Sequence, residues 1–262
     1  MDLGLHDQLV LITGGSKGIG LACALAFAAE GARIAIASRD ADNLTQAALA
    51  LRAIGCDPIL VQADLQDAPQ AERMVAEVQA AGDAIAVLVT CAGAARRTPA
   101  AELRPAHWAA AMQSKFFTTI HAMGAVLPGM CARRAGAIVN VVGMGGKTAS
   151  TIHLPGGSAN AALMLASAGL ANAHAGQGVR VNVVNPGMTA TDRLHEGLAA
   201  ESRLTGTPVD VLLAARTRAM PLGRICEPHE IAALVVFLAS AQASYISGAV
   251  VSADGAATPM VV

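Results

Sequence analysis

Short, continuous apolar runs alternate along this chain with stretches rich in Ala and Leu, and this alternation constrains its fold more than any other feature. Seven such runs are rich in Val, Ile and Leu. Strands that are buried on both faces have this composition, and they occur in parallel sheets covered by helices. The pattern therefore predicts an α/β fold, with a doubly wound, seven-stranded parallel sheet and helices on both faces. The predicted strands are residues 9–13, 33–38, 58–63, 85–90, 137–142, 180–184 and 249–253.

The stretches between the strands predict helices, listed by residue at the end of this paragraph. No linker rich in Pro, Gly or Ser and no internal repeat divides the sequence, so residues 1–262 are predicted to form a single domain. Residues 188–220 mix Thr, Gly, Pro and charged residues after the sixth strand. This segment is predicted to be an insertion that lies over a site as a substrate lid. The predicted helices are near 18–30, 42–54, 67–81, 105–128, 157–175 and 227–240.

Charge and composition exclude several classes of partner. The net charge is −1, and no basic stripe or zinc-finger spacing is present, so nucleic acid is not an expected partner. No His, Cys and carboxylate cluster has metal-ligand spacing, so no metal site is expected. Residues 148–179 lack Asp, Glu, Lys and Arg, but their apolar runs are far shorter than the roughly 20 residues of a membrane span. We expect this stretch to be buried against another helix or subunit.

Cysteine usage indicates the compartment. The chain has five cysteines, an odd number, and none forms a C-x-x-C pair. We therefore expect reduced core residues in a cytoplasmic protein rather than a disulfide framework.

A glycine-rich loop, TGGSKGIG at residues 13–20, follows the first predicted strand and opens a helix. Gly14 allows the turn, Gly18 lets the backbone approach a diphosphate, and Gly20 allows close helix packing. The helix N-terminus then faces the anion. A tight strand–helix turn without a ligand is the alternative, and the strand–loop–helix context argues against it. The loop predicts a dinucleotide-binding site.

The end of the second strand indicates which dinucleotide is preferred. NAD-binding folds commonly place Asp or Glu there to bond the ribose 2′-hydroxyl, whereas this chain has Ser38 and Arg39. Lys17 adds a second cation in the glycine loop. A small hydroxyl and two cations suit a 2′-phosphate, which needs charge-assisted partners. NADP(H) is therefore predicted over NAD(H), the alternative being that Lys17 and Arg39 are ordinary solvated side chains.

Motifs along nearly the whole chain resemble those of the short-chain dehydrogenase/reductase family. They are TGGSKGIG (13–20), ADL (63–65), CAG (91–93), GAIVNVV (136–142), RVNVVNPGMTAT (180–191), PLGRICEPHEIAALVVFLAS (221–240) and YISGAVVSADGA (245–256). The resemblance implies a Rossmann-like domain, binding of NAD(P)(H) and, usually, a tetramer. It also implies that Asp64 bonds the adenine and that Cys91 stands where the family usually has Asn.

The motif positions and the glycine loop together predict the cofactor-binding residues. The set comprises Gly14, Ser16, Lys17, Gly18, Ile19, Gly20, Ser38, Arg39, Asp64, Leu65, Cys91, Ala92, Gly93, Asn160, Pro186, Gly187, Thr189 and Thr191.

The resemblance fails at the reaction centre, where the family normally uses Asn, Ser, Tyr and Lys. By the family's spacing the serine position is Gly143, the tyrosine and lysine positions are Gly156 and Asn160, and the asparagine position is Lys115. The single tyrosine, Tyr245, is not followed four residues later by lysine, so no Tyr-x-x-x-Lys exists in the chain. The chain is therefore expected to be an atypical member that lacks this tetrad.

The departures have chemical consequences. A positioned general acid contributes roughly 10²–10⁴-fold to a rate, and glycine at 143 and 156 cannot donate through a side chain. The missing side chains are expected to leave room for a larger ligand or ordered water. Lys115 and Asn160 look exchanged, so Lys115 would return an ammonium to the pocket while Asn160 bonds the ribose. The alternative is a chance pair, with Lys115 extending its amine from a buried helix towards solvent.

His153 is the other candidate, because it precedes the tyrosine position by three residues and its ordinary pKa suits proton transfer. The catalytic candidates are thus Lys115, His153 and Asn160. Lys147 and Thr148 are weaker candidates on the same loop, and Cys91 is expected to be a packed side chain rather than a nucleophile.

Three functions remain open at this point. The favoured one is an NADP(H)-dependent oxidoreductase with a non-standard proton donor, acting on a small carbonyl, imine or enone. The alternatives are a catalytically degenerate, cofactor-binding regulatory protein, or a non-redox lyase or isomerase that reuses the pocket. In each case a homotetramer or dimer is expected, with residues 105–128 and 148–179 packed between subunits.

Overall fold

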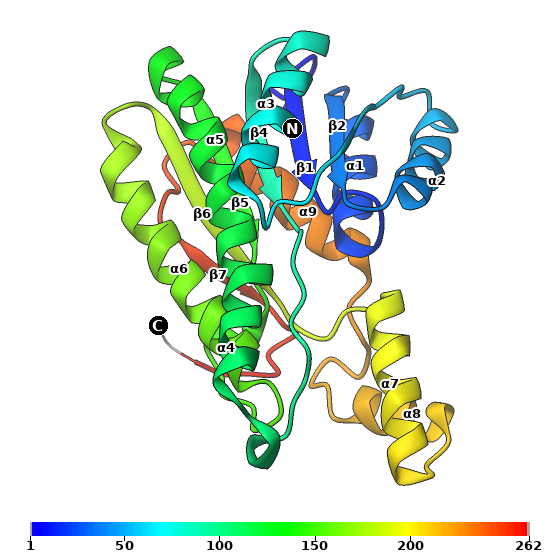
Figure 1. Cartoon of the computed structure of the whole chain (residues 1–262). Helices are drawn as coiled ribbons and strands as arrows, with labels where there is room; N and C mark the ends of the chain where they lie inside the picture. Colours follow the sequence, from blue (N-terminus) through cyan, green and yellow to red (C-terminus); the bar gives the residue numbers. More distant parts are fainter. Residues whose placement is uncertain (1, 261–262) are drawn as a thin grey trace.

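Seven parallel strands form one sheet in the order β3-β2-β1-β4-β5-β6-β7 in the structure, a computed structural model that describes residues 2–260 (Figure 1). The order reverses between β1 and β4, and ligands of such sheets bind outside the carboxyl ends of the strands at this reversal. The predicted doubly wound α/β fold is confirmed. The strands are β1 Leu9–Thr13, β2 Arg33–Ser38, β3 Ile59–Gln62, β4 Ile85–Thr90, β5 Gly136–Val141, β6 Val179–Pro186 and β7 Val250–Ala253.

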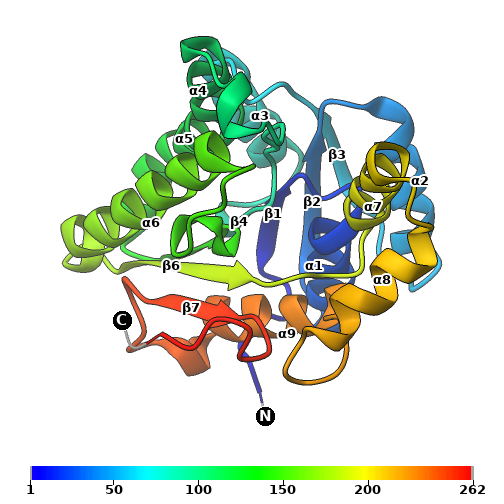
Figure 2. The same cartoon turned by 90° about the horizontal axis from the view of Figure 1, so that it is seen from below.

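Helices cover both faces of the sheet, as Figure 2 shows from below. Alternate residues of β1 explain why its sequence is continuously apolar: Val10 and Ile12 belong to the core formed with α1 and α9, whereas Leu9 and Leu11 belong to the core formed with α3 and α5. The helices are α1 Gly18–Ala29, α2 Ala41–Arg52, α3 Ala68–Ala81, α4 Pro105–Ala111, α5 Thr118–Arg133, α6 Leu154–Ala175, α7 Asp192–Thr205, α8 Val209–Arg218 and α9 Pro228–Ala239.

The helix predicted near 105–128 is present, but it contains a π-helical turn and ends at Arg133. After α4 the chain forms a π-helical turn, η2 (Met112–Phe117), and then α5, which continues past Pro128. Such turns are frequent at functional sites. Here η2 is fixed by a contact with another segment, because the Gln113 side chain donates to the Gln66 carbonyl at 2.6 Å. Local apolar spacing carries no signal for that contact.

Segment 188–220 forms two helices, α7 and α8, beyond the end of β6 (Figure 1). An ion pair of 2.8 Å between Arg216 and Glu201 joins them. At the base of the segment, Cys226 N donates to Met188 O at 3.2 Å and Ala190 N donates to Cys226 O at 2.8 Å. The start and the end of the segment are therefore held together.

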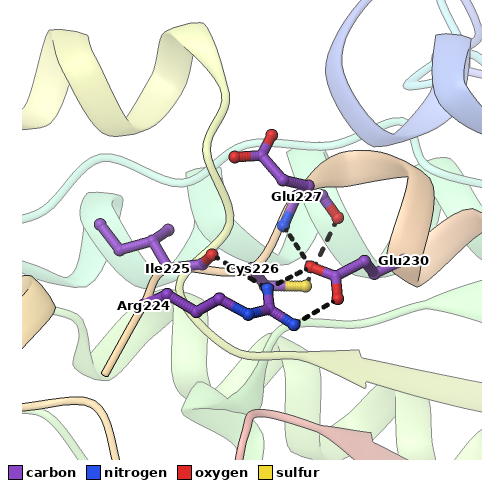
Figure 3. Close-up of polar contacts among 5 residues, drawn as sticks. All are labelled: Arg224, Ile225, Cys226, Glu227 and Glu230. Carbon is purple, nitrogen blue, oxygen red and sulfur yellow. Dashed lines mark hydrogen bonds and ion pairs between the residues drawn. The ribbon is translucent and has the colours of Figure 1, made fainter. Parts of the chain in front are cut away.

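A polar cluster fixes the exit of this segment to the start of α9 (Figure 3). Both terminal nitrogens of Arg224 donate to the Glu230 carboxylate at 2.6 Å, and Glu227 N donates to the same carboxylate at 2.8 Å. The bonds from Arg224 lower the pKa of Glu230 to about 2. Glu230 therefore serves as the capping carboxylate of α9 and as the anchor of the chain that leaves α8. In residues 2–260 we find no helix with the length and apolar character that a membrane crossing requires.

Candidate functional site

The glycine loop lies against the carboxyl end of β4. Gly14 and Gly18 have positive φ angles of 66° and 56°, a conformation that costs side-chain-bearing residues energy. A Cβ atom on Gly14 would lie 2.7 Å from Ala92 N, and one on Gly20 would collide with Gly14 O. The loop can therefore keep this backbone path only with glycine at residues 14 and 20.

Two helix N-termini converge beside this loop. Lys17 is the N-cap of α1 and Thr191 is the N-cap of α7. A Cβ atom on Gly18 would lie 3.4 Å from the Thr191 methyl group, so the two helix starts face each other across the glycine. Ile19 lies in the first turn of α1, partly buried. Because helix N-termini present free N–H groups and positive dipole ends, this place suits a diphosphate.

The end of β2 lies next to the same loop. The Ser16 hydroxyl donates to the Ser38 hydroxyl at 3.1 Å, while Lys17 and Arg39 are both exposed. The three side chains predicted to choose between the two dinucleotides, Lys17, Ser38 and Arg39, therefore come from neighbouring segments.

The end of β3 supplies Asp64 and Leu65. The Asp64 carboxylate accepts a hydrogen bond from Gln66 N at 3.1 Å, and Leu65 is buried. This arrangement leaves the second Asp64 oxygen for another donor.

His153 occupies the space beside Gly156. A Cβ atom on Gly156 would lie 2.5 Å from His153 Nε2 and 2.9 Å from the Ala95 methyl group, in collision with the imidazole ring. The expectation of open space at residue 156 is therefore wrong, because the ring of His153, the N-cap residue of α6, fills that space. Among the residues that the structure describes, His153 Nδ1 is buried without a hydrogen-bond partner.

Asn160 occupies the space at the other vacant position. It is 2% exposed, and its Nδ2 donates to Gly143 O at 3.0 Å. A Cβ atom on Gly143 would lie 3.3 Å from that nitrogen, so this position is also not an open cavity. Asn160 Oδ1 is buried and has no partner within residues 2–260. It is free to accept a hydrogen bond from a bound molecule.

Lys115 lies in η2, close to the CAG segment. The Cβ position of Gly93 is 3.4 Å from Lys115 Cα and 3.6 Å from its Cγ. Burial, and next the nearby Arg193, lower the pKa of Lys115 from its ordinary 10.5 to about 8. A neighbouring cation therefore adds to the effect of burial on this pKa.

Arg193, at the start of α7, approaches the same point. Its Nη2 donates to Gly93 O at 3.2 Å. Burial, and then the cations Lys115, Arg97 and Arg193, lower the pKa of His153. We call Lys115, Arg97, Arg193 and His153 together the cationic cluster. Sequence reasoning missed Arg97 and Arg193, although each follows the carboxyl end of a strand, β4 or β6, where site residues of parallel sheets gather.

Other candidates lie elsewhere or are inert. Lys147 turns away from the cluster, since its Nζ donates to Val250 O at 3.2 Å and to the Ser252 hydroxyl at 2.9 Å. Contact with the Cys23 thiol, together with burial, raises the pKa of Cys91 well above its ordinary value. The Cys91 thiol therefore stays protonated, as expected of a packed side chain. All five cysteines are free.

The turn after β6 completes the site. Gly187 N donates to Ala253 O at 2.9 Å, and the Thr189 hydroxyl donates to Gly187 O at 3.2 Å. A Cβ atom on Gly187 would lie 2.8 Å from Asp254 Cα. Pro186 ends β6 and Thr191 starts α7, so this turn links the strand end to the helix start beside the glycine loop.

Comparisons with known proteins agree with this geometry. A family model described as enoyl-(acyl carrier protein) reductase matches residues 14–258. The L-tagatose-forming galactitol 2-dehydrogenase of Cereibacter sphaeroides is 36% identical over 97% of this chain and 96% of its own. L-sorbose reductase from Gluconobacter frateurii, solved with NADPH and L-sorbose, superposes with a TM-score of 0.94 at 28% identity over 100% of both chains. An NADPH-bound short chain oxidoreductase from Pseudomonas aeruginosa PAO1, which contains an atypical catalytic center, has a TM-score of 0.88 at 29% identity over 98% of this chain and 100% of its own.

Proposed function

The chain belongs to the short-chain dehydrogenase/reductase family, and from that premise we propose that it is an NADP(H)-dependent oxidoreductase that interconverts an alcohol and a carbonyl on a sugar- or polyol-type substrate. We further propose that it works without the family's usual tetrad, with His153 as the group that exchanges the substrate proton. The observation that carries this proposal is the His153 ring in the space beside Gly156.

The residues present fit the dinucleotide. The glycine loop leaves a path that side chains would block, and the N-termini of α1 and α7 meet beside it. Ser38, Lys17 and Arg39 supply a hydroxyl and two exposed cations for a 2′-phosphate. The relatives solved with NADPH support the same choice. When bound, NADP(H) supplies or accepts a hydride at its nicotinamide.

His153 suits the role of base in alcohol oxidation. Because burial and the neighbouring cations lower its pKa, the imidazole is neutral near pH 7 and can accept a hydroxyl proton. The cations Lys115 and Arg193 also stabilise the negative charge that develops on the substrate oxygen. Asn160 Oδ1 offers an acceptor to a hydroxyl of the substrate or of the cofactor ribose.

The test is oxidation with NADP⁺, and reduction with NADPH, of a panel that contains galactitol, threitol and L-sorbose. We expect turnover in the wild type and a loss of roughly 10²–10⁴-fold in kcat in His153→Gln, the usual contribution of general acid–base catalysis. The dissociation constant of NADPH should change little. His174→Gln, at the other end of α6, is the matched control.

Gly156→Ala provides a second test. Its added methyl group must displace the His153 ring, so turnover should fall. Because both changes act through the same ring, Gly156→Ala combined with His153→Gln should be no slower than His153→Gln alone. Additive losses would contradict the role of the ring. A wild type that binds NADPH but turns over no alcohol, ketone, imine or enone would contradict the oxidoreductase proposal.

A further inference from the structure

The cationic cluster is assembled from segments far apart in the sequence around one short stretch of backbone, residues 93–97. Lys115 in η2 and Arg193 in α7 meet at Gly93, the first through its Cα and Cγ atoms and the second through a hydrogen bond of 3.2 Å to the carbonyl. The Ser114 hydroxyl donates to Ala94 O and holds the stretch against η2. The position of the Lys115 ammonium therefore depends on tertiary contacts.

The other end of the stretch reaches the proposed reaction centre. The Ala95 methyl group lies 2.9 Å from the Cβ position of Gly156, the place that the His153 ring also adjoins. Arg97 follows two residues later and is exposed, as is Arg193. Lys115 and His153 are partly buried. The guanidinium groups of Arg97 and Arg193 thus lie at the rim of the site, and Lys115 and His153 lie deeper.

Among residues 2–260, no ion pair joins the cluster to a carboxylate. The charged neighbours that act on the pKa values of Lys115 and His153 are all cations. A partly buried cation among like charges is costly unless an anion joins it. Two buried polar atoms, His153 Nδ1 and Asn160 Oδ1, also lack partners among the described residues.

The phosphates of the cofactor do not provide this anion in the arrangement proposed above. Their proposed contacts are the glycine loop, Ser38, Lys17, Arg39 and the N-terminus of α7, so Arg193 is the member of the cluster that lies near them. Lys115, Arg97 and His153 follow β4 or lie at the start of α6, away from those contacts. By the family resemblance the nicotinamide would bind at the latter place, and its oxidised ring would itself be positive. An additional anion is needed there, and the substrate is the molecule that can supply it.

We propose that the substrate is a hydroxy acid, whose carboxylate binds Lys115, Arg193 and Arg97 while its reacting hydroxyl faces His153. This inference rests on the proposed function. In the oxidation, the C–H bond of the carbinol carbon breaks and its hydride passes to NADP⁺. The O–H proton passes to the neutral His153, and the C–O bond becomes a C=O bond. The products are the oxo acid, NADPH and one proton, which His153 releases to solvent.

The experiment measures binding, by calorimetry on the NADPH-bound protein, of three pairs of equal carbon number: galactonate and galactitol, threonate and threitol, glycerate and glycerol. At least one acid should bind about 10-fold or more tightly than its polyol, because charge-assisted bonds are much stronger than neutral ones. Arg97→Gln, at the exposed cation that is assigned only to the carboxylate, should reduce that advantage while polyol and NADPH affinities stay within about 3-fold. Arg203→Gln, an exposed residue later in α7, should change nothing.

The inference is overturned if no acid binds more tightly than its polyol, or if Arg97→Gln leaves the acid advantage intact. It is also overturned if inorganic phosphate binds more tightly than all three acids, which would indicate a phosphate ester. Binding and turnover are separable. Oxidation of polyols with no preference for acids would contradict this inference alone, whereas tight acid binding without any turnover would contradict the proposed function alone.

Discussion

At residue 156 the lack of a side chain determines where a neighbouring ring lies. The His153 imidazole occupies the volume that any larger residue at 156 would take. A side chain is excluded at Gly157 as well, because a Cβ atom there would lie 2.5 Å from Gly145 O. Glycines on both segments therefore let the loop after β5 pack directly against the first turns of α6, and this close packing shapes the site at the scale of single residues.

The choice of dinucleotide is decided by single side chains. We expect NADPH to bind more tightly than NADH, and Arg39→Ala to narrow that difference by about 10-fold or more, since a guanidinium–phosphate contact is charge-assisted. Calorimetry measures the affinities of NADPH and NADH for the wild type and for Arg39→Ala. Arg73→Ala on α3, where the guanidinium pairs with Glu77 at 3.3 Å, is the control. Equal affinities in the wild type, or a preference for NADH, would contradict the prediction.

The buried ammonium of Lys115 should lower the free energy of unfolding of the protein. Its pKa of about 8 lies below the ordinary 10.5, so folding disfavours the protonated form. The cost is fully present below about pH 8 and fades as the pH rises towards 10.5. Since one pH unit corresponds to about 1.4 kcal/mol, Lys115→Met should raise the free energy of unfolding at pH 7 by roughly 1–3 kcal/mol. Urea denaturation measures the change, and a less stable Met variant would contradict it.

At the scale of elements, the interrupted helix matters most. A continuous helix from 105 to 128 would rotate the residues after the turn, whereas η2 places Lys115 against Gly93 and is itself held to Gln66. The position of the ammonium is therefore a property of the α4–η2–α5 element and not of Lys115 alone.

The junction between α8 and α9 gives a prediction at the same scale. Glu230→Gln should lower the Tm at neutral pH, because it removes the ionised acceptor of Arg224 and of Glu227 N (Figure 3). The pKa of this carboxyl is lowered from 4.5 to about 2. Its contribution is therefore present above pH 4.5 and is lost as the pH falls towards 2.

Thermal unfolding between pH 7 and pH 3 measures the difference in Tm between the wild type and Glu230→Gln, which should narrow as the solution becomes acidic. Glu77→Gln, which breaks an exposed ion pair on α3, is the matched change and should have a smaller effect. A difference in Tm that does not depend on pH would show that the carboxylate charge is not the cause.

At the scale of the whole molecule, an apolar groove between α5 and α6 is the feature that predicts assembly. Leu165 is 78% exposed on α6. Burial of such a surface stabilises association. We expect a dimer or tetramer that packs through this groove and the uncharged stretch 148–179. The groove is lined by Ile120, Met123, Gly124, Leu127, Ala166, Gly169 and Leu170.

Light scattering at micromolar concentration should find this assembly, and Leu165→Glu should dissociate it, because a carboxylate cannot be buried there without a partner. Val211→Glu changes a residue on α8 that is 47% exposed and should leave the assembly intact. A monomeric wild type would contradict the prediction, and so would equal effects of the two changes.

The layers of this protein follow from its sequence. A strand covered on both faces is apolar at most positions, so the seven strands could be located from composition, although β5 and β6 also bury Asn140, Asn182 and Asn185. The glycine loop marked the end of β1. The end of the long predicted helix and the two helices within 188–220 could not be located in this way, because η2 is held by the Gln113–Gln66 contact and α7 and α8 pack on each other.

The arrangement of side chains in the proposed reaction centre could not be predicted from the sequence. Sequence spacing predicted vacant space at Gly156, and the fold filled it with the ring of His153. Lys115 was a candidate from its position, but its approach to Arg193 at Gly93 depends on α7 folding back over the end of β4. The physical reason is that charge and proximity act through space, and parallel strands bring to one edge of the sheet residues that are far apart in the chain.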